Sequence, residues 1–97
     1  MAKLICHNSV SQWENEQVSK YPEIKFFIDK LKNNICKKPE SGFPDPCLST
    51  AGKTIPCRKL SVNISLFPHK HAIGYSYITA SYIHNDDIIY IAKMAFS

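Results

Sequence analysis

Apolar side chains recur with a helical period in the segment that follows Pro22. Intervals of three and four residues separate the large apolar side chains Ile24, Phe27, Ile28, Leu31 and Ile35. This spacing gathers them on one stripe of an amphipathic helix, with lysines and other polar residues on the opposite side. We expect the helix to end near Lys37, because Pro39 disfavours a helical conformation in the residue before it.

The residues before Pro22 predict a short strand and a first helix. Residues 3–7 are apolar enough for an opening strand, and Ser11 and Glu14 have the spacing of a capping box. We therefore expect a helix over residues 12–20, interrupted at Pro22, which can open the next helix. Two helices joined by so short a turn form an α-hairpin.

Proline and glycine interrupt the middle of the chain. They recur through residues 39–56, at Pro39, Gly42, Pro44, Pro46, Gly52 and Pro56. We expect an irregular loop here with at most a short extended piece. A loop of this length in a small domain usually serves a function.

The C-terminal part of the chain changes to the period of a strand. Apolar and polar residues alternate over residues 59–66, a turn follows at 67–70, and residues 72–83 are rich in strand formers. A second turn at 84–87 precedes a final strand over 88–96. Alternation predicts two faces for this last strand: one with Ile88, Tyr90, Ala92, Met94 and Phe96, the other with Ile89, Ile91 and Lys93.

This order of elements predicts an α+β fold in a single domain over residues 1–97. An N-terminal strand and an α-hairpin would pack on a mainly antiparallel sheet. The chain has 97 residues and 44% of them are hydrophobic, which suffices for one thin core. That size excludes a multidomain enzyme and a deep pocket around a large cofactor.

Positive charge concentrates between residues 32 and 71. The whole chain carries a formal charge of +4, and this stretch alone contains seven lysines and arginines against two acids. A basic field of this kind attracts phosphate backbones or an acidic protein surface.

No segment has the apolar length of a membrane span or the core of a signal peptide. We therefore expect a cytoplasmic protein without membrane contact, whose 4 cysteines are reduced thiols. We expect no metal, because the cysteine and histidine spacings match no zinc pattern. We expect no cofactor either, because a Gly-rich phosphate loop is missing.

The C-terminal part resembles the RelE/ParE superfamily of bacterial toxins from toxin–antitoxin systems. The resemblance rests on the element order, β-α-α-β-β-β, and on residues 57–60 (CRKL), 72–77 (AIGYSY) and 86–92 (DDIIYIA), with Phe96 at the end. It implies a metal-independent endoribonuclease that cuts translated mRNA on the ribosome and is restrained by a cognate antitoxin protein. In such cleavage the 2′-hydroxyl attacks the adjacent phosphate, so the protein must supply a base, an acid and a cation.

Cations, histidines and tyrosines of this chain have the chemistry that the resemblance requires. The planar guanidinium of arginine suits a phosphate, and histidine titrates near neutral pH. We expect catalytic roles for Arg58, Lys59, His69, His71 and Lys93. We expect RNA binding by Lys53, Lys70, Tyr75 and Tyr77, the tyrosines by stacking on bases.

Two other functions stay open. A ParE-like toxin would poison gyrase instead. A small non-catalytic inhibitor, encoded by a phage or a mobile element, would block a larger protein or nucleoprotein machine. Convergence of the cations and a histidine in one concavity would favour the nuclease, whereas their dispersal beside exposed apolar residues would favour the binding protein.

Overall fold

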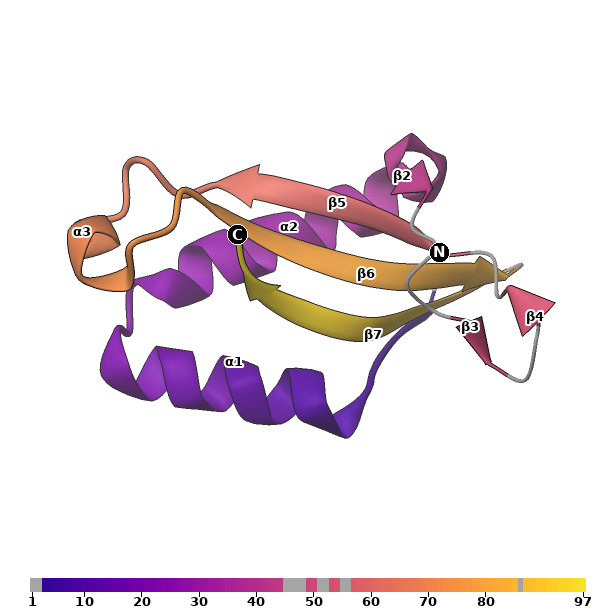
Figure 1. Cartoon of the computed structure of the whole chain (residues 1–97), viewed down its shortest axis with the longest axis horizontal. Helices are drawn as coiled ribbons and strands as arrows, with labels where there is room; N and C mark the ends of the chain where they lie inside the picture. The colour runs from indigo at the N-terminus through magenta and orange to yellow at the C-terminus, as the bar shows by residue number, and fades with distance from the viewer. Residues whose placement is uncertain (1–2, 45–48, 51–52, 55–56, 86) are drawn as a thin grey trace.

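A mixed five-stranded sheet carries two helices on one of its faces (Figure 1). The computed structural model describes residues 3–44, 49–50, 53–54, 57–85 and 87–97. The elements are, in chain order, β1 (Lys3–Cys6), α1 (Asn8–Lys20), α2 (Ile24–Lys37), the 3-10 helix η1 (Pro39–Ser41), β2 (Phe43–Pro44), β3 (Ser49–Thr50), β4 (Lys53–Thr54), β5 (Arg58–Asn63), α3 (Lys70–Ile73), β6 (Tyr77–Asn85) and β7 (Ile88–Phe96). The α+β class and the order of the main elements are as predicted.

The sheet has the strand order β1-β7-β6-β5-β2. β5, β6 and β7 form an antiparallel meander, and β2 pairs with only the first part of β5. β1 runs parallel to β7, its neighbour in the sheet. β3 and β4 pair with each other in a separate hairpin within the segment predicted to be irregular.

The apolar stripe of α2 fills the core, as its period predicts. Ile24, Ile28, Leu31 and Ile35 are fully buried. They form one cluster with side chains from α1 and from the meander, among them Val10, Val62, Ile78, Ile89 and Ile91. The helix ends at Lys37, just before Pro39, as predicted, but it begins at Ile24 and Pro22 lies outside it.

The first helix begins earlier than predicted. It starts at Asn8, and the Nδ1 atom of His7 accepts a hydrogen bond from the backbone N–H of Ser9 (3.1 Å). Ser11 lies inside the helix, so the predicted capping box is wrong. β1 ends at Cys6 and the helix follows at once, so His7 is the side chain that caps the backbone N–H groups at the start of α1.

The first meander strand is shorter than predicted. β5 ends at Asn63, whose Oδ1 atom accepts a hydrogen bond from the N–H of Ser65 (2.7 Å) and turns the chain. Leu66, predicted to continue the apolar face, is 89% exposed, and Phe67 is buried instead.

A short helix replaces the predicted start of the second meander strand. α3 ends at Gly74, where φ is 79°, a left-handed conformation that glycine adopts without strain. β6 therefore begins at Tyr77 and not near residue 72.

A bulge in β7 changes which of its side chains face the core. Ser81 pairs with Lys93, but the next residue, Tyr82, pairs with Ile91, so β7 holds one extra residue. Ile89 and Ile91 are fully buried, whereas Lys93 is exposed on the other face. The predicted grouping of these three side chains is wrong, because one extra residue reverses the alternation.

Candidate functional site

The open face of the sheet is the side that faces the viewer in Figure 1, opposite α2. No residue within β1, β5, β6 or β7, all of them described, is acidic. Side chains of the three central strands line a shallow groove of about 230 Å³ on this face. An anion can approach this part of the sheet without meeting a carboxylate of these strands.

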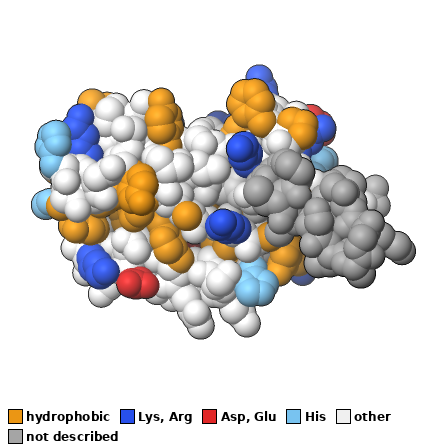
Figure 2. Space-filling view, in the orientation of Figure 1, with side chains coloured by type: hydrophobic (Ala, Val, Ile, Leu, Met, Phe, Trp, Pro, Cys, Tyr) orange, Lys and Arg blue, Asp and Glu red, His pale blue; other side chains and the backbone are white. Residues whose placement is uncertain are grey.

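Two lysines flank a serine across the three central strands. Lys59 of β5 pairs with Ser81 of β6, and Ser81 pairs with Lys93 of β7. Neighbouring strands lie about 4.8 Å apart, which separates the two lysine Cα atoms by roughly 10 Å. Both lysines are exposed and line the groove together with Ser81, and Figure 2 shows blue side chains near the middle of this face. Their flexible side chains can bring both ammonium groups to one phosphate or to two successive phosphates.

A row of hydroxyl groups lies beside the lysines. The Oγ1 atom of Thr79 is 2.7 Å from the Oγ atom of Ser61 and 2.6 Å from the Oγ atom of Ser97. Thr79 and Ser97 also line the groove. Each hydroxyl can donate and accept, so the row offers hydrogen bonds to phosphate or sugar oxygens.

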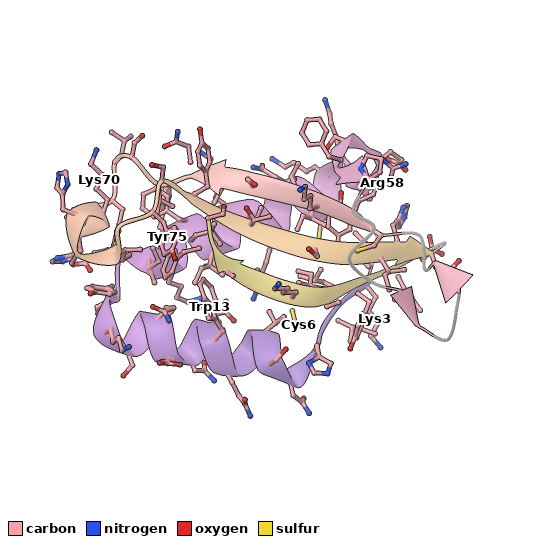
Figure 3. All side chains as sticks on the ribbon, in the orientation of Figure 1. Lys3, Cys6, Trp13, Arg58, Lys70 and Tyr75 are labelled. Atoms are coloured by element: carbon pink, nitrogen blue, oxygen red, sulfur yellow. The ribbon has the colours of Figure 1, made fainter. Side chains whose placement is uncertain are left out.

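Two exposed tyrosines lie at the end of the sheet near α3. Tyr77 is 44% exposed at the start of β6. Tyr75 is 52% exposed and stacks on Phe96, with ring centroids 6.1 Å apart and an angle of 7° between the planes. Phe96 pairs with the buried Ile78, and its ring also packs on Trp13 of α1 (5.1 Å between centroids), so only Tyr77 continues the open face, whereas Tyr75 packs at the end of the sheet (Figure 3).

Lys70 and His71 lie next to Tyr75. These three residues, with Gly74 and Ser76, line a second hollow of about 300 Å³. His69 has a different environment, because its ring packs on Tyr21 (5.3 Å between centroids) and Phe67 (5.5 Å). The two histidines therefore differ, because the ring of His69 packs on two aromatic rings whereas His71 lines the hollow with Lys70.

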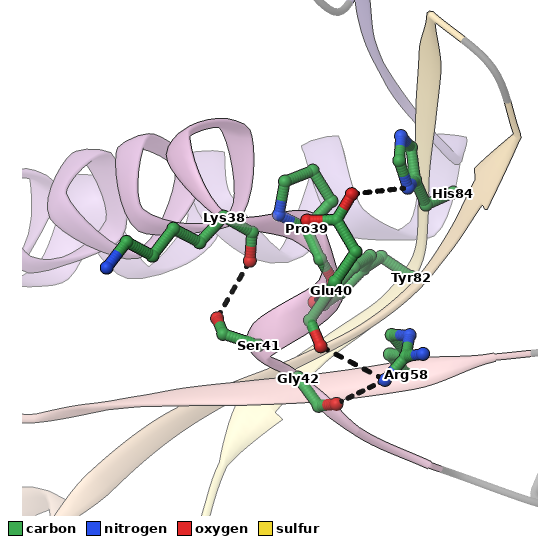
Figure 4. A network of polar contacts seen from close by, with 8 residues as sticks. All are labelled: Lys38, Pro39, Glu40, Ser41, Gly42, Arg58, Tyr82 and His84. Atoms are coloured by element: carbon green, nitrogen blue, oxygen red, sulfur yellow. Dashed lines mark hydrogen bonds and ion pairs between the residues drawn. The ribbon is translucent and has the colours of Figure 1, made fainter.

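Arg58 precedes Lys59 in β5, but its side chain does not join the groove. Its Nη1 atom donates to the backbone carbonyl oxygens of Gly42 (2.9 Å) and Glu40 (3.2 Å), as Figure 4 shows. Figure 3 places Arg58 and Lys70 at opposite ends of the molecule. The guanidinium thus joins β5 to η1, and it does not line the groove that contains Lys59 and Lys93.

A separate hollow of about 350 Å³ surrounds Arg58. It is lined by Glu40, Pro44, Cys57, Arg58 and His84, and the carboxylate of Glu40 lies 4.0 Å from the Nδ1 atom of His84. Nearby, the hydroxyl of the buried Tyr82 donates to the carbonyl oxygen of Pro39 (2.5 Å). Burial raises the pKa of the Tyr82 hydroxyl. These contacts hold η1 against the sheet, and the carboxylate in this hollow makes it a poor site for phosphate.

Of the residues predicted from the sequence, the structure thus brings together Lys59 with Lys93, and Lys70 and His71 with Tyr75. Lys53 lies in β4, and its side chain is outside the described part of the chain. The sequence reasoning missed Ser61, Thr79, Ser81 and Ser97. The alternation of Tyr77, Thr79 and Ser81 with apolar residues was the signal that places them on one strand face, although Ser81 is itself only 7% exposed.

Three of the 4 cysteines lie in the described part of the chain. No disulfide joins Cys6, Cys36 and Cys57 to one another, and Cys47 lies outside the described residues. Burial raises the pKa of the Cys6 thiol. The described residues contain no group of three or more histidines, cysteines or acids that could hold a metal ion.

None of the helices in the described ranges is long and apolar enough to cross a membrane.

Comparisons with known proteins add no relative, since no protein-family model, no curated protein and no solved structure matches this chain. The resemblance to RelE/ParE toxins and the antitoxin partner that it implies therefore stay predictions.

Proposed function

We propose that this protein binds single-stranded RNA on the open face of its sheet. The observation that carries the proposal is the row Lys59–Ser81–Lys93, which places two cations around a polar groove on a face whose strands carry no acid. The RNA backbone lies over this row, and the RNA strand continues across the exposed ring of Tyr77.

The chemistry of the surface matches an unpaired strand with accessible bases. Lysines neutralise phosphates, and exposed aromatic rings stack on bases, with little dependence on sequence. Sheet faces that carry aromatic side chains are a common platform for single-stranded RNA. The hydroxyls of Ser61, Thr79 and Ser97 add hydrogen-bonding groups for the 2′-hydroxyl, which distinguishes RNA from DNA.

The proposal is for binding, because the groups needed for cleavage are dispersed. The guanidinium of Arg58 bonds to backbone carbonyls, and the ring of His69 packs on two aromatic rings. His71 lies in the second hollow, beside Tyr75. Cleavage of mRNA, implied by the resemblance, is a separate prediction that is tested below.

The test is the affinity for a labelled single-stranded RNA, measured by fluorescence anisotropy at several salt concentrations. We expect Lys59→Ala and Lys93→Ala each to weaken binding roughly tenfold, as expected for loss of a hydrogen bond to a charged group. Each change should also lower the salt slope by about 0.7, the value for one phosphate contact on a single strand. Lys20→Ala is the matched control, because Lys20 lies on α1 and pairs with Glu16.

Stacking is tested separately at Tyr77. Tyr77→Ala should weaken binding, whereas Tyr77→Phe should keep most of the affinity, because the ring is retained. A DNA strand of the same sequence should bind more weakly than the RNA. If Lys20→Ala weakens binding as much as Lys59→Ala and Lys93→Ala do, binding is nonspecific and the open face is not the site.

A further inference from the structure

The outer edge of β5 is a second surface, distinct from the open face. β2 pairs with Lys59 and Arg58 only. From Leu60 to Asn63, the part of the chain that the structure describes places no strand beside the outer edge of β5. A strand edge of this kind can accept an extended segment by backbone hydrogen bonding.

A groove follows this edge between β5 and the last turns of α2. Its volume is about 360 Å³, and its lining residues are Asn34, Lys37, Lys38, Ser41, Leu60 and Ser61. Leu60 is half-buried and supplies an apolar surface on the α2 side of the strand. The groove therefore offers a backbone edge, an apolar contact and a basic wall.

The basic wall is not neutralised within the described chain. Lys37 and Lys38, the lysines that line the groove, are exposed, and neither takes part in an ion pair between described residues. The acid of α2, Asp29, pairs with Lys25 at 3.2 Å instead. The charge along this side of α2 is therefore positive and calls for an acidic partner.

We propose that the edge of β5 binds an acidic extended peptide segment of a partner protein. The segment adds as a strand along residues 60–63 of β5, the part of this edge that β2 leaves unpaired. Side chains of an added strand alternate between the two faces of the sheet. Those on the α2 side meet Leu60 and the lysines, so carboxylates at every second position fit this surface. The lysines of the open face lie on the other side of the added strand, and Ser61 is the one residue that both surfaces include.

The probe is a labelled peptide of about ten residues in which glutamate alternates with threonine, long enough for one strand. We expect it to bind and to slow amide hydrogen exchange in β5 between residues 60 and 63. A peptide with lysine in place of glutamate should not bind. The glutamate peptide N-methylated at four consecutive central residues should lose binding, because it cannot donate backbone hydrogen bonds.

Charge reversal at Lys37 and Lys38 tests whether these lysines bind the peptide. Lys37→Glu combined with Lys38→Glu should weaken peptide binding about tenfold or more at low salt. The control is Lys20→Glu combined with Lys25→Glu, which makes the same change in net charge at lysines that pair with Glu16 and Asp29. The control should keep the affinity within about twofold, and its RNA binding reports separately on the open face.

Three results would overturn the proposal. The first is no binding of the glutamate peptide up to about 1 mM, or binding without protection of β5 amides. The second is equal loss of affinity in the two charge-reversed variants. The third is displacement of the peptide by single-stranded RNA from both the wild type and the double variant Lys59→Ala/Lys93→Ala. RNA would then bind the lysines of α2, and the groove would be a nucleic-acid surface.

Discussion

Gly42 lies where the chain passes closest to the sheet after η1. A methyl group at this position would collide with the hydroxyl of Tyr82 and lie 3.0 Å from both the Cβ atom of Arg58 and the carbonyl oxygen of Lys59. We predict that Gly42→Ala lowers the free energy of unfolding by about 1–3 kcal/mol, the usual cost of overpacking. Urea denaturation measures this cost.

Coupling to Tyr82 separates this clash from a general effect of replacing glycine. Combined with Tyr82→Phe, Gly42→Ala should cost less than it does alone, because the clashing hydroxyl is gone. Gly74→Ala is the control: its surroundings are open and only its φ of 79° is unfavourable, so its cost should not depend on Tyr82. Strict additivity of Gly42→Ala and Tyr82→Phe would contradict the assignment.

The buried hydroxyl of Tyr82 makes stability depend on pH in the alkaline range. Burial raises the pKa of Tyr82 above its ordinary value of 10.0, so the unfolded chain ionises first as the pH rises. The contribution is fully present below about pH 10 and is lost above it. Urea midpoints between about pH 9 and 11 should fall more steeply for the wild type than for Tyr82→Phe; parallel curves would show that Tyr82 does not contribute.

Arg58 should matter for stability more than for RNA binding. Arg58→Ala removes two hydrogen bonds from a charged donor to the carbonyls of Glu40 and Gly42, which should cost about 1–3 kcal/mol. RNA affinity should change much less than it does in Lys59→Ala. If Arg58→Ala leaves stability intact and abolishes RNA binding, Arg58 contacts the nucleic acid and the role assigned here is wrong.

At the scale of the element, α2 stabilises the fold through one face. Leu31 is fully buried, whereas Phe26, on the same helix, is 68% exposed. Leu31→Ala should lower the free energy of unfolding by about 2–5 kcal/mol, because it removes packing and leaves a cavity. Phe26→Ala should cost much less. Denaturant titration of the two variants compares them directly, and equal losses would mean that α2 packs through a different face.

The bulge in β7 is what makes the groove compatible with the core. On a regular strand, Lys93 would share its face with Ile91 and Ile89, so either the lysine or both isoleucines would lie on the wrong side. The extra residue lets Ile89 and Ile91 stay buried while Lys93 lies next to Ser81. A single irregularity thus serves both the packing and the candidate site.

At the scale of the whole molecule, the dispersed cations predict binding without cleavage. We expect that translated mRNA in a ribosome-containing extract stays intact when the protein is added, because Arg58 and the histidines lie outside the groove. Primer extension on the message measures cleavage. The wild type is compared with Arg58→Ala, with a double change at His69 and His71, and with the double variant Lys59→Ala/Lys93→Ala.

The opposite result is equally informative. Cleavage by the wild type that is lost in any of these variants would support the RelE/ParE resemblance and assign the residues concerned to the reaction. Growth arrest on expression without cleavage would instead favour a target other than RNA, such as gyrase or another protein machine.

The sequence by itself determined the parts of the fold that depend on local periodicity. The stripe of α2 and the alternation in the meander report which side chains leave water, because that burial repeats every 3.6 or every 2 residues. These patterns sufficed for the α+β class, for the end of α2 and for the range of β7. Lys59 and Lys93 became candidates through their charge and the resemblance to RelE/ParE toxins, which these patterns alone would not have supplied.

Only the tertiary structure decided how these pieces meet. The start of α1 depends on where β1 leaves the sheet, and the faces of β7 depend on a bulge that no local pattern marks. The row Lys59–Ser81–Lys93 depends on the pairing of three strands, and the position of Arg58 depends on the carbonyls of Gly42 and Glu40, 16 and 18 residues away in the chain. Strand register and long-range hydrogen bonds are set by packing of the whole domain, so no window of sequence contains them.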